Sequence, residues 1–425
     1  MQIAGTLSVP MDDPRPLPRS VKRALGEALS DTPVVCVLGP RQCGKTTLVR
    51  TLSPARTYLT LDDPDLLSAA LADPGNFVES LPRVVTLDEI QRAPGLLPAI
   101  KRRVDEDRRP GQLILTGSAN ILLLPRVSES LAGRMEIIRL HPLTESEKER
   151  RSGGFLQALL DGKLAAKVSK VRGKHAGAST LVDRVVAGGY PEPLGRTRAR
   201  AARWYAQYIA AILERDVRDI ATIRGSGELR RLLEMCAIRT GTLLNVSSLA
   251  TDLGIARATL DGYLAVLERM YLIRRLPAWH TNASRRLMKT AKIHIVDTGL
   301  GAALAGLSKD DFTASRERFG PLLESWVFAQ IEAQSAWSNP SLRCSHFRNK
   351  DQLEVDLVLT QGARVWGIEV KAGKSVQAAD CRSLEHLASL VGKNFKGGFV
   401  LYDGIDCMSM GNGILAVPLS WLWEM

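Results

Sequence analysis

The chain has 425 residues, 45% of them hydrophobic and 24% charged, which is enough for about two to four domains, each with its own core. We expect no membrane span, since no apolar run approaches the ~18 residues that one needs, and the N-terminal stretch lacks a signal peptide's apolar core. The six cysteines are scattered without a metal-type pair, which favours a reduced, cytoplasmic setting. A net charge of +12 favours a polyanionic partner such as nucleic acid, although a solvated basic surface gives the same excess.

The stretch "VVCVLGPRQCGKTTL", residues 34–48, has the pattern of a phosphate-binding loop between a strand and a helix. Backbone N–H groups of such a loop bind phosphates, together with the partial positive charge of the helix N-terminus. Lys45 is expected to reach the β- and γ-phosphates of ATP, and the Thr46 hydroxyl to ligate Mg²⁺. The predicted nucleotide-binding residues of this loop are Gly39, Pro40, Arg41, Gln42, Cys43, Gly44, Lys45, Thr46 and Thr47.

A second part of the nucleotide site is predicted at the end of a buried strand over Val84–Leu87. Asp88 follows this strand and is placed to hold the Mg²⁺ shell directly or through water. Glu89, one residue further on, is expected to polarise the attacking water as a general base.

A third strand is predicted over Leu113–Leu115, between the loop strand and the strand that ends in Asp88. Either Ser118 or Asn120, both just after it, is expected to orient the water beside the γ-phosphate. A helical stretch then ends at Arg134. This arginine either stabilises charge on the nucleotide of a neighbouring subunit in a homo-oligomer or caps the helix C-terminus.

Several motifs appear in a fixed order within residues 39–147: "GPRQCGKTTL", "YLTLDDP", "TLDEIQRAPGLLPAIK", "LILTGSAN", "LAGR" and "HPLTESE". Together they resemble a family of bacterial and archaeal AAA+-type ATPases whose C-terminal half is usually called a domain of unknown function. The resemblance implies ATP hydrolysis, a parallel sheet with strand order 5-1-4-3-2 and a trans-acting role for Arg134. Cys43 departs from the family's usual Val, Ser or Ala, and in this fold its side chain points away from the phosphates.

An ATPase core is thus expected over residues 1–145, and a helical, basic lid or linker over 146–225. The long helix of the lid contains Arg215 and Arg218. These two arginines either approach the nucleotide or pair with nearby acids along the helix.

Residues 226–300 are predicted as a winged helix, with three helices, a tight turn at Gly254 and a two-stranded wing. The helix expected to enter a DNA groove begins "ARATLD" and has few groups that read bases, so contacts to phosphates from the wing are expected. The alternative is a module that docks a protein partner. The cations in and around the wing are Arg274, Arg275, Arg285, Arg286, Lys289 and Lys292.

Residues 301–425 carry a Glu on a helix, an Asp on an alternating strand and Glu-x-Lys on the next strand, which resembles the PD-(D/E)XK nuclease fold. Asp356 and Glu369 are expected to hold Mg²⁺ against a scissile phosphate, with Glu324 completing the metal shell. Lys371 lies two residues along the same strand and would activate water or offset developing charge. The alternatives are a nuclease-like fold kept for binding and a structural Glu–Lys pair.

The sequence therefore predicts an α/β ATPase that uses ATP and Mg²⁺ and acts through C-terminal winged-helix and nuclease-like domains. Three classes of function stay open. They are a DNA-processing ATPase, an ATP-dependent switch that binds nucleic acid without cutting it, and a regulatory ATPase that acts on a protein partner.

Overall fold

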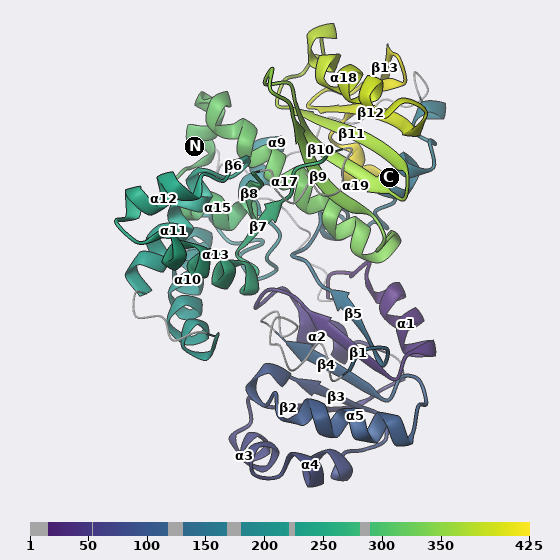
Figure 1. The fold of residues 1–425 in the computed structure, drawn as a ribbon, viewed down its shortest axis with the longest axis vertical. Helices are drawn as coiled ribbons and strands as arrows, with labels where there is room; N and C mark the ends of the chain where they lie inside the picture. The colour runs from purple at the N-terminus through teal and green to yellow at the C-terminus, as the bar shows by residue number, and fades with distance from the viewer. Residues whose placement is uncertain (1–15, 53, 118–130, 168–179, 221–225, 281–289) are drawn as a thin grey trace, which may run out of the picture. The chain divides into compact units, whose positions relative to one another are not determined.

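The computed structural model describes residues 16–52, 54–117, 131–167, 180–220, 226–280 and 290–425 (Figure 1). The chain divides into two compact units, which are described separately. The N-terminal unit comprises residues 16–143 with 269–271, and the C-terminal unit comprises residues 144–268 and 272–425.

A five-stranded parallel sheet forms the centre of the N-terminal unit (Figure 1). Its order, β2-β3-β4-β1-β5, is the predicted order 5-1-4-3-2 read from the opposite edge, so the prediction is confirmed. The central strands β1, β3 and β4 are buried along their full length, as expected for parallel strands covered on both faces. The strands are β1 (Val34–Leu38), β2 (Thr57–Thr60), β3 (Val85–Asp88), β4 (Leu113–Gly117) and β5 (Met135–Arg139).

Helices flank this sheet, and their starts follow from the sequence. Asp63 and Asp73 each cap a helix by accepting backbone N–H bonds, and a proline follows each of them at the first helical position. Helix α1 contacts β1 and β5, whereas α4 contacts both α3 and α5. The helices are α1 (Lys22–Asp31), α2 (Lys45–Arg50), α3 (Pro64–Ala72), α4 (Pro74–Ser80) and α5 (Leu96–Glu106), with a 3-10 turn, η1, at Ile90–Arg92.

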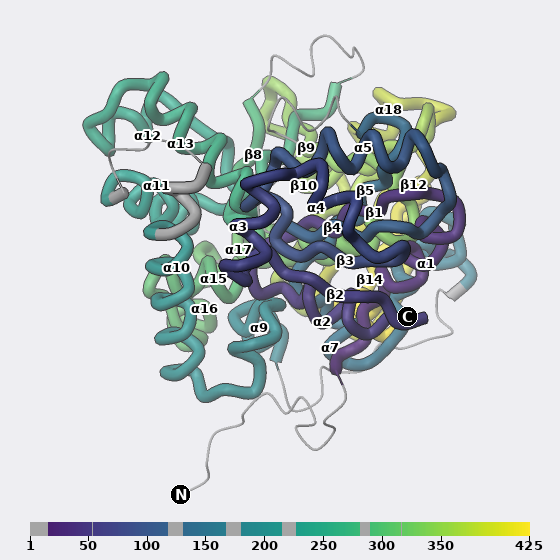
Figure 2. Tube along the Cα trace, turned by 90° about the horizontal axis from the view of Figure 1, so that it is seen from below, coloured from purple at the N-terminus to yellow at the C-terminus, as the bar shows by residue number. Residues whose placement is uncertain are grey.

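The C-terminal unit begins with helices, of which α11, α12 and α13 group together in both views of the chain (Figures 1 and 2). Gly254 ends α12 with a φ of 66°, a left-handed conformation that suits glycine, and so makes the predicted tight turn. These helices are α7 (Glu145–Lys148), α8 (Phe155–Leu160), α9 (Leu181–Ala187), α10 (Arg198–Ile220), α11 (Ser226–Ile238), α12 (Val246–Leu253) and α13 (Arg257–Arg269), with a 3-10 turn, η3, at Ala165–Lys167.

A small antiparallel sheet accompanies the helices α11 to α13. Its strands are β6 (Thr242–Leu243), β7 (Ile273–Leu276) and β8 (Lys292–Ile295), in the order β6-β8-β7. The chain order is therefore helix, strand, two helices and two strands, and β8 lies in the middle of the sheet.

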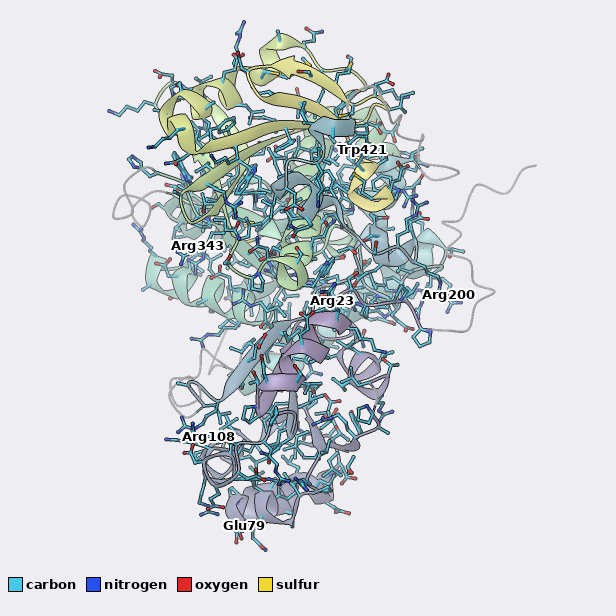
Figure 3. The ribbon with its side chains drawn as sticks, turned by 90° about the vertical axis from the view of Figure 1, so that its right-hand side faces the viewer. Arg23, Glu79, Arg108, Arg200, Arg343 and Trp421 are labelled. Atoms are coloured by element: carbon cyan, nitrogen blue, oxygen red, sulfur yellow. The ribbon has the colours of Figure 1, made fainter. Side chains whose placement is uncertain are left out.

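A six-stranded mixed sheet forms the last part of the C-terminal unit, in the order β13-β14-β12-β11-β10-β9. Helix α18 packs against β10, β11 and β12, and α17 contacts β11. Trp421, on the last helix, is 1% exposed (Figure 3). The elements are α15 (Thr298–Ala305), α16 (Lys309–Ala314), α17 (Arg316–Ser338), β9 (Arg343–Arg348), β10 (Glu354–Gln361), β11 (Arg364–Lys371), α18 (Arg382–Val391), β12 (Phe395–Tyr402), β13 (Met408–Gly411), β14 (Ile414–Pro418) and α19 (Trp421–Glu424), with 3-10 turns η4 (Ala378–Cys381) and η5 (Gly392–Asn394).

Candidate functional site

The loop between β1 and α2 is a tight turn that leaves no room for side chains at its start. A Cβ atom on Gly39 would lie 2.1 Å from the carbonyl oxygen of Leu140, so only glycine fits there. Gly44 precedes α2 with a φ of 99°, in the region that glycine adopts without strain. The Cys43 side chain is buried and its sulfur lies 3.6 Å from the same Leu140 carbonyl. The loop thus directs backbone groups, and not side chains, toward the N-terminus of α2.

Lys45 is folded back onto this loop. Its ammonium group is buried and donates to the carbonyl oxygens of Gly39 at 3.0 Å and Pro40 at 2.8 Å. These weak acceptors can be exchanged for phosphate oxygens, which are stronger acceptors for a charged donor. Lys45 is therefore positioned to bind the phosphates of a nucleotide that enters the loop.

Asp88 accepts hydrogen bonds from three hydroxyl groups on three different elements. Thr46, in the first turn of α2, donates to it at 2.9 Å, and Tyr58 of β2 and Thr116 of β4 donate to the same carboxylate. Asp88 is 4% exposed and Thr116 is fully buried. A hydroxyl and a carboxylate in direct contact form the oxygen donor set that Mg²⁺ prefers, so Thr46 and Asp88 fit the predicted metal site of the nucleotide.

Tyr58 was not identified by the sequence analysis, although it lies in the quoted motif "YLTLDDP". Burial, together with its bond to Asp88, raises the pKa of Tyr58 to about 12. The phenol therefore stays protonated and remains a hydrogen-bond donor at neutral pH. The guanidinium of Arg50 lies 4.1 Å from the centre of its ring, which holds the ring in place.

Glu89 follows Asp88 and has a left-handed backbone with a φ of 59°, which is uncommon for a residue other than glycine. Its carboxylate accepts a hydrogen bond from the side-chain amide of Gln91. A left-handed backbone at a residue other than glycine is one of the strained conformations that cluster at functional sites. The general-base role of Glu89 stays a prediction.

Thr116 is the polar residue that β4 directs at Asp88. The predicted water-orienting residues, Ser118 and Asn120, lie outside the described residues, so the choice between them stays open. The sequence places Thr116 at the polar end of the predicted third strand, and it reaches Asp88 because β3 and β4 pair in parallel with Leu87 beside Leu115.

Arg134 lies in a turn immediately before β5. Its guanidinium pairs with the carboxylate of Asp105 on α5 and donates to the carbonyl oxygen of Ala132 at 3.0 Å. This pairing lowers the pKa of Asp105. The arginine is 23% exposed, so part of its side chain is accessible. Both predicted roles of Arg134 therefore stay open, and the helix that it was expected to end falls on residues outside the described ranges.

Arg19 is a further residue of the site that the sequence analysis did not identify. Its guanidinium donates to the carbonyl oxygen of Cys43 at 2.6 Å and to that of His141 at 2.5 Å. It therefore links the phosphate-binding loop to the segment that follows β5. No local sequence pattern indicates this contact, because Arg19 and His141 are 122 residues apart in the chain.

A pocket of about 430 Å³ in the C-terminal unit brings the predicted nuclease-like residues together. Glu324 comes from α17, Asp356 from β10, and Glu369 and Lys371 from β11. Asp356 accepts a hydrogen bond of 2.9 Å from the backbone N–H of Val370. The four side chains therefore come from one helix and two strands and line the same pocket.

Lys292 lies among these carboxylates and was interpreted wrongly from the sequence. It was expected to contact DNA phosphates, but it is 2% exposed and pairs with Glu324 at 3.1 Å, Glu354 at 2.5 Å and Asp356 at 3.5 Å. The reason is that carboxylates from α17 and β10 pack around its ammonium group, so that even a lysine on the short strand β8 is buried.

The other cations of the wing differ in their surroundings. Arg274 is mostly buried and pairs with Glu332, and Arg275 is more exposed and pairs with Glu268. The remaining three, Arg285, Arg286 and Lys289, lie outside the described residues. The side chains of the two lid arginines, Arg215 and Arg218, also lie outside them.

Burial is the first cause of the pKa shifts of the acids in this pocket. Burial, followed by repulsion from Asp356, raises the pKa of Glu324 to about 8, and burial raises the pKa of Glu369 well above its usual range. Burial lowers the pKa of Lys292, but the carboxylates outweigh this effect and raise it overall. Among the described residues, no group of three or more His, Cys, Asp or Glu side chains is arranged to hold a metal ion. The metal site at Glu324, Asp356 and Glu369 stays a prediction.

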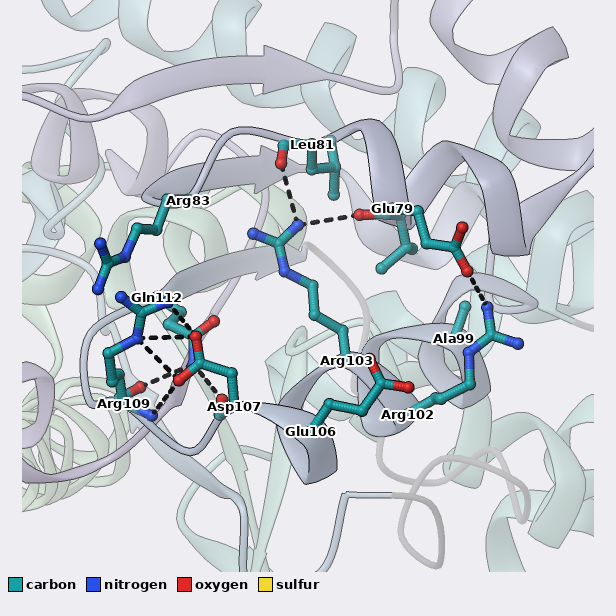
Figure 4. A pocket seen from close by; sticks show the side chains of 11 residues that line it. Glu79, Leu81, Arg83, Ala99, Arg102, Arg103, Glu106, Asp107, Arg109 and Gln112 are labelled. Atoms are coloured by element: carbon teal, nitrogen blue, oxygen red, sulfur yellow. Dashed lines mark hydrogen bonds and ion pairs between the residues drawn. The ribbon is translucent and has the colours of Figure 1, made fainter.

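A pocket of about 330 Å³ in the N-terminal unit is lined by several arginines (Figure 4). Arg102 pairs with Glu79, Arg109 pairs with Asp107, and Arg103 donates to backbone carbonyl oxygens. Arg103 therefore serves to hold the chain between α4 and β3. Three of the charged residues labelled in Figure 3, Arg23, Glu79 and Arg108, take part in ion pairs.

The parallel sheet, the phosphate-binding loop and the Thr46–Asp88 pair define the N-terminal unit as a P-loop ATPase of the AAA type. Residues 31–148 match a family model described as an AAA domain. Residues 178–311 and 319–422 match two models that are each described as a domain of unknown function (DUF8612 and DUF4143). The predicted resemblance to AAA-type ATPases is confirmed.

Two mycobacterial proteins match nearly the full chain. Uncharacterized protein Rv2008c of Mycobacterium tuberculosis and Uncharacterized protein Mb2031c of Mycobacterium bovis are each 30% identical over 403 residues, which cover 94% of this chain and 83% of each relative. The chain belongs to the family of these proteins.

Among solved structures, the chain is similar to the Walker-type ATPase PABY2304 of Pyrococcus abyssi, with 18% identity, a TM-score of 0.41 and coverage of 69% of this chain and 99% of that one. The RuvB Holliday junction branch migration motor of Thermotoga maritima is 19% identical, with a TM-score of 0.28 and coverage of 60% and 89%. No helix in the described part of the chain is long and apolar enough to cross a membrane.

Proposed function

We propose that the protein hydrolyses Mg²⁺-ATP at the β1–α2 loop, and that this nucleotide cycle controls the binding of nucleic acid by the C-terminal unit without cutting it. The contact of the Thr46 hydroxyl with the Asp88 carboxylate carries the proposal, because it places the two expected Mg²⁺ ligands side by side at the nucleotide loop.

The roles of the residues follow from their positions. Lys45 would exchange its two carbonyl acceptors for phosphate oxygens, and Thr46 and Asp88 would hold Mg²⁺, which supplies positive charge to the transferring phosphoryl group. Glu89 would orient and deprotonate the attacking water. Tyr58 and Thr116 would keep the Asp88 carboxylate in one orientation through their hydroxyl groups.

The order of elements in the C-terminal unit supports binding of nucleic acid. The sequence α11, β6, α12, α13, β7, β8 with the sheet order β6-β8-β7 is the arrangement expected for a winged helix. The exposed start of α13 offers Arg257 but is otherwise poor in groups that read base edges. The net charge of +12 favours contacts to phosphates, so we expect affinity with little sequence preference.

Cleavage is disfavoured by the position of Lys292. Its ammonium group already neutralises the carboxylates that would have to bind a catalytic metal ion. The pairing of Arg274, Arg275 and Lys292 with acids also reduces the free charge on the wing, which keeps a protein partner as the second candidate.

Fluorescence anisotropy of labelled duplex DNA tests the proposal in wild-type protein, Lys45→Ala and Glu89→Gln, with and without Mg²⁺-ATP. We expect DNA binding whose affinity changes with ATP in wild type and Glu89→Gln, and does not change in Lys45→Ala. No nicking of a supercoiled plasmid by the wild type in Mg²⁺ or Mn²⁺ is expected. An absence of DNA binding below physiological salt would favour the protein-partner alternative, and plasmid nicking that Asp356→Ala abolishes would restore the nuclease.

A further inference from the structure

Lys292 is surrounded by carboxylates that come from separate elements. Its Nζ atom lies 3.1 Å from Glu324 on α17, and 2.5 Å and 3.5 Å from Glu354 and Asp356 on β10. The lysine side chain is 2% exposed, whereas the three acids are 13–26% exposed through the pocket. The ammonium group is therefore more deeply buried than the carboxylates around it.

The side chains of the pocket are unbalanced in formal charge. Its lining includes the acids Glu324, Glu354, Asp356, Glu369 and Asp380 but only three cations, Lys292, Arg348 and Lys371. Arg348 pairs with Glu354 and Lys371 lies 3.7 Å from both Glu369 and Asp380. Lys292 is thus the cation that directly contacts Glu324 and Asp356.

A second observation, independent of the acid count, is an unpaired oxygen. Glu369 is 5% exposed and lines the pocket, yet its Oε1 atom has no hydrogen-bond partner. A buried acceptor without a donor costs free energy unless a cation or a donor satisfies it. The oxygen atoms of the pocket therefore depend on a cation, and Lys292 is the cation in contact with two of the three carboxylates that are expected to hold a metal ion.

We propose that Lys292 is the built-in cation of this pocket, and that its ammonium group takes the place of a hard divalent cation such as Mg²⁺ or Mn²⁺. With Lys292 in place the pocket does not bind such an ion, and without Lys292 it does. The inference rests on the proposed function in one respect, which is that the C-terminal unit binds nucleic acid without cutting it.

The lysine also has a consequence for how the C-terminal unit is held together. Lys292 belongs to β8 of the three-stranded sheet, whereas Glu354 and Asp356 belong to β10 of the six-stranded sheet. The ion pairs thus connect two sheets that belong to different predicted domains. Removal of the ammonium group leaves like charges close together and unpaired, which destabilises the unit unless another cation enters.

Thermal unfolding of the full chain without nucleotide, in EDTA and in 1 mM Mn²⁺, tests the proposal. All seven tryptophans lie in the C-terminal unit, so tryptophan fluorescence follows the unfolding of this unit. For wild type we expect the same Tm in both buffers. For Lys292→Met we expect a Tm lower by about 5 °C or more in EDTA and recovery of most of this loss in Mn²⁺.

Two controls separate the pocket from general effects. Lys148→Met removes another buried lysine of the same unit, which pairs with Glu145 and does not line this pocket, and should lower Tm equally in both buffers. Lys292→Arg keeps the positive charge and should show no recovery by Mn²⁺. Calorimetric titration of Lys292→Met should give one Mn²⁺ site, with an affinity at least tenfold above that of wild type. Asp356→Asn added to Lys292→Met should remove this site.

The proposal is overturned if wild type binds Mn²⁺ as tightly as Lys292→Met, or if a folded Lys292→Met binds none. Should Lys292→Met fail to fold, the double variant Lys292→Met with Glu354→Gln removes one cation and one anion. It leaves Glu324, Asp356 and Glu369 for the metal, and failure of this variant to bind Mn²⁺ overturns the proposal as well. ATP hydrolysis and DNA binding are measured separately on wild type, so a negative Mn²⁺ result does not depend on them.

Discussion

The hydroxyl of Thr46 and the carboxylate of Asp88 are 2.9 Å apart, although the two residues are 42 positions apart in the chain. The contact joins the first turn of α2 to the end of β3. It brings the two expected Mg²⁺ ligands together at the loop on which the Lys45 ammonium group donates to the carbonyl oxygens of Gly39 and Pro40.

We expect the substitutions Lys45→Ala and Glu89→Gln to separate nucleotide binding from hydrolysis. Lys45→Ala removes the charged donor of the loop and should abolish binding of a fluorescent ATP analogue. Glu89→Gln keeps the shape of the side chain but removes the base, so ATP binding should persist while kcat falls by about a hundredfold or more. Wild-type turnover by Glu89→Gln would exclude Glu89 as the base.

The bond from Thr116 to Asp88 predicts a second effect on turnover. Thr116→Val should lower kcat/KM by about tenfold to a hundredfold and raise the Mg²⁺ concentration needed for half-maximal activity, because a hydrogen bond to a carboxylate is lost.

Thr86→Val is the matched control for Thr116→Val. Thr86 is buried on β3 and its hydroxyl has no hydrogen-bond partner, so its loss should leave activity near that of wild type. Equal effects of the two substitutions would mean that packing, and not the Asp88 contact, is responsible.

A trans-acting role of Arg134 predicts that activity depends on assembly. Arg134→Ala retains the loop and Lys45→Ala retains the arginine, so a mixture of the two inactive proteins should recover ATPase activity. Asp105→Asn, which frees Arg134 from its ion pair, should keep the activity of wild type. Specific activity that is constant on dilution, with no recovery in the mixture, would show that Arg134 acts only within its own chain.

Binding of DNA through phosphates predicts a steep dependence on salt. The affinity should fall by about 0.9 log unit per log unit of salt for each phosphate neutralised, with little difference between unrelated duplexes of one length. Arg285→Glu with Arg286→Glu should weaken binding to all of them alike and leave ATP binding unchanged. An interaction that does not respond to salt would contradict this prediction.

The buried imidazole of His294 predicts a dependence of stability on pH. Burial, with the neighbouring charge of Lys292, lowers its pKa from 6.5 to about 3. Between these two values the unfolded chain binds a proton that the folded chain does not. Stability should therefore fall as the pH drops below 6.5, by up to ~1.4 kcal/mol per pH unit from this group.

Urea unfolding of wild type and His294→Asn at several pH values, followed by tryptophan fluorescence, measures this contribution. The asparagine does not titrate and retains a group that can contact the Ser325 hydroxyl, 2.9 Å from the imidazole. The difference in unfolding free energy should shrink as the pH falls from 7 to 5. A constant difference would contradict the depressed pKa.

The buried strands of the central sheet were predictable because the loop motif, the Asp88 motif and the apolar runs are all local patterns, whereas the order of the strands came from the resemblance to AAA+-type ATPases. Sequence reasoning also placed Glu324, Asp356, Glu369 and Lys371 on the correct elements, since periodicity alone assigns a residue to a helix or a strand. It failed for Lys292, because a lysine on a short strand reads as exposed, and the partners that bury it lie 32 to 64 residues further along the chain. Tyr58 and Arg19 were missed because the groups that they contact also lie far along the chain, 30 residues away for Tyr58 and 24 and 122 residues away for Arg19.

The two hydrogen bonds of Arg19 set a practical boundary for the smallest fragment that can bind nucleotide. A fragment that begins at α1, with Lys22, retains every residue of the loop motif but loses the donor to the carbonyl oxygens of Cys43 and His141. Without Arg19 these two carbonyl oxygens lose a charged hydrogen-bond donor, which raises the free energy of the folded loop. The residues just before α1 are therefore part of the architecture of the phosphate loop, although they lie more than twenty positions upstream of the Cys43 carbonyl that Arg19 holds.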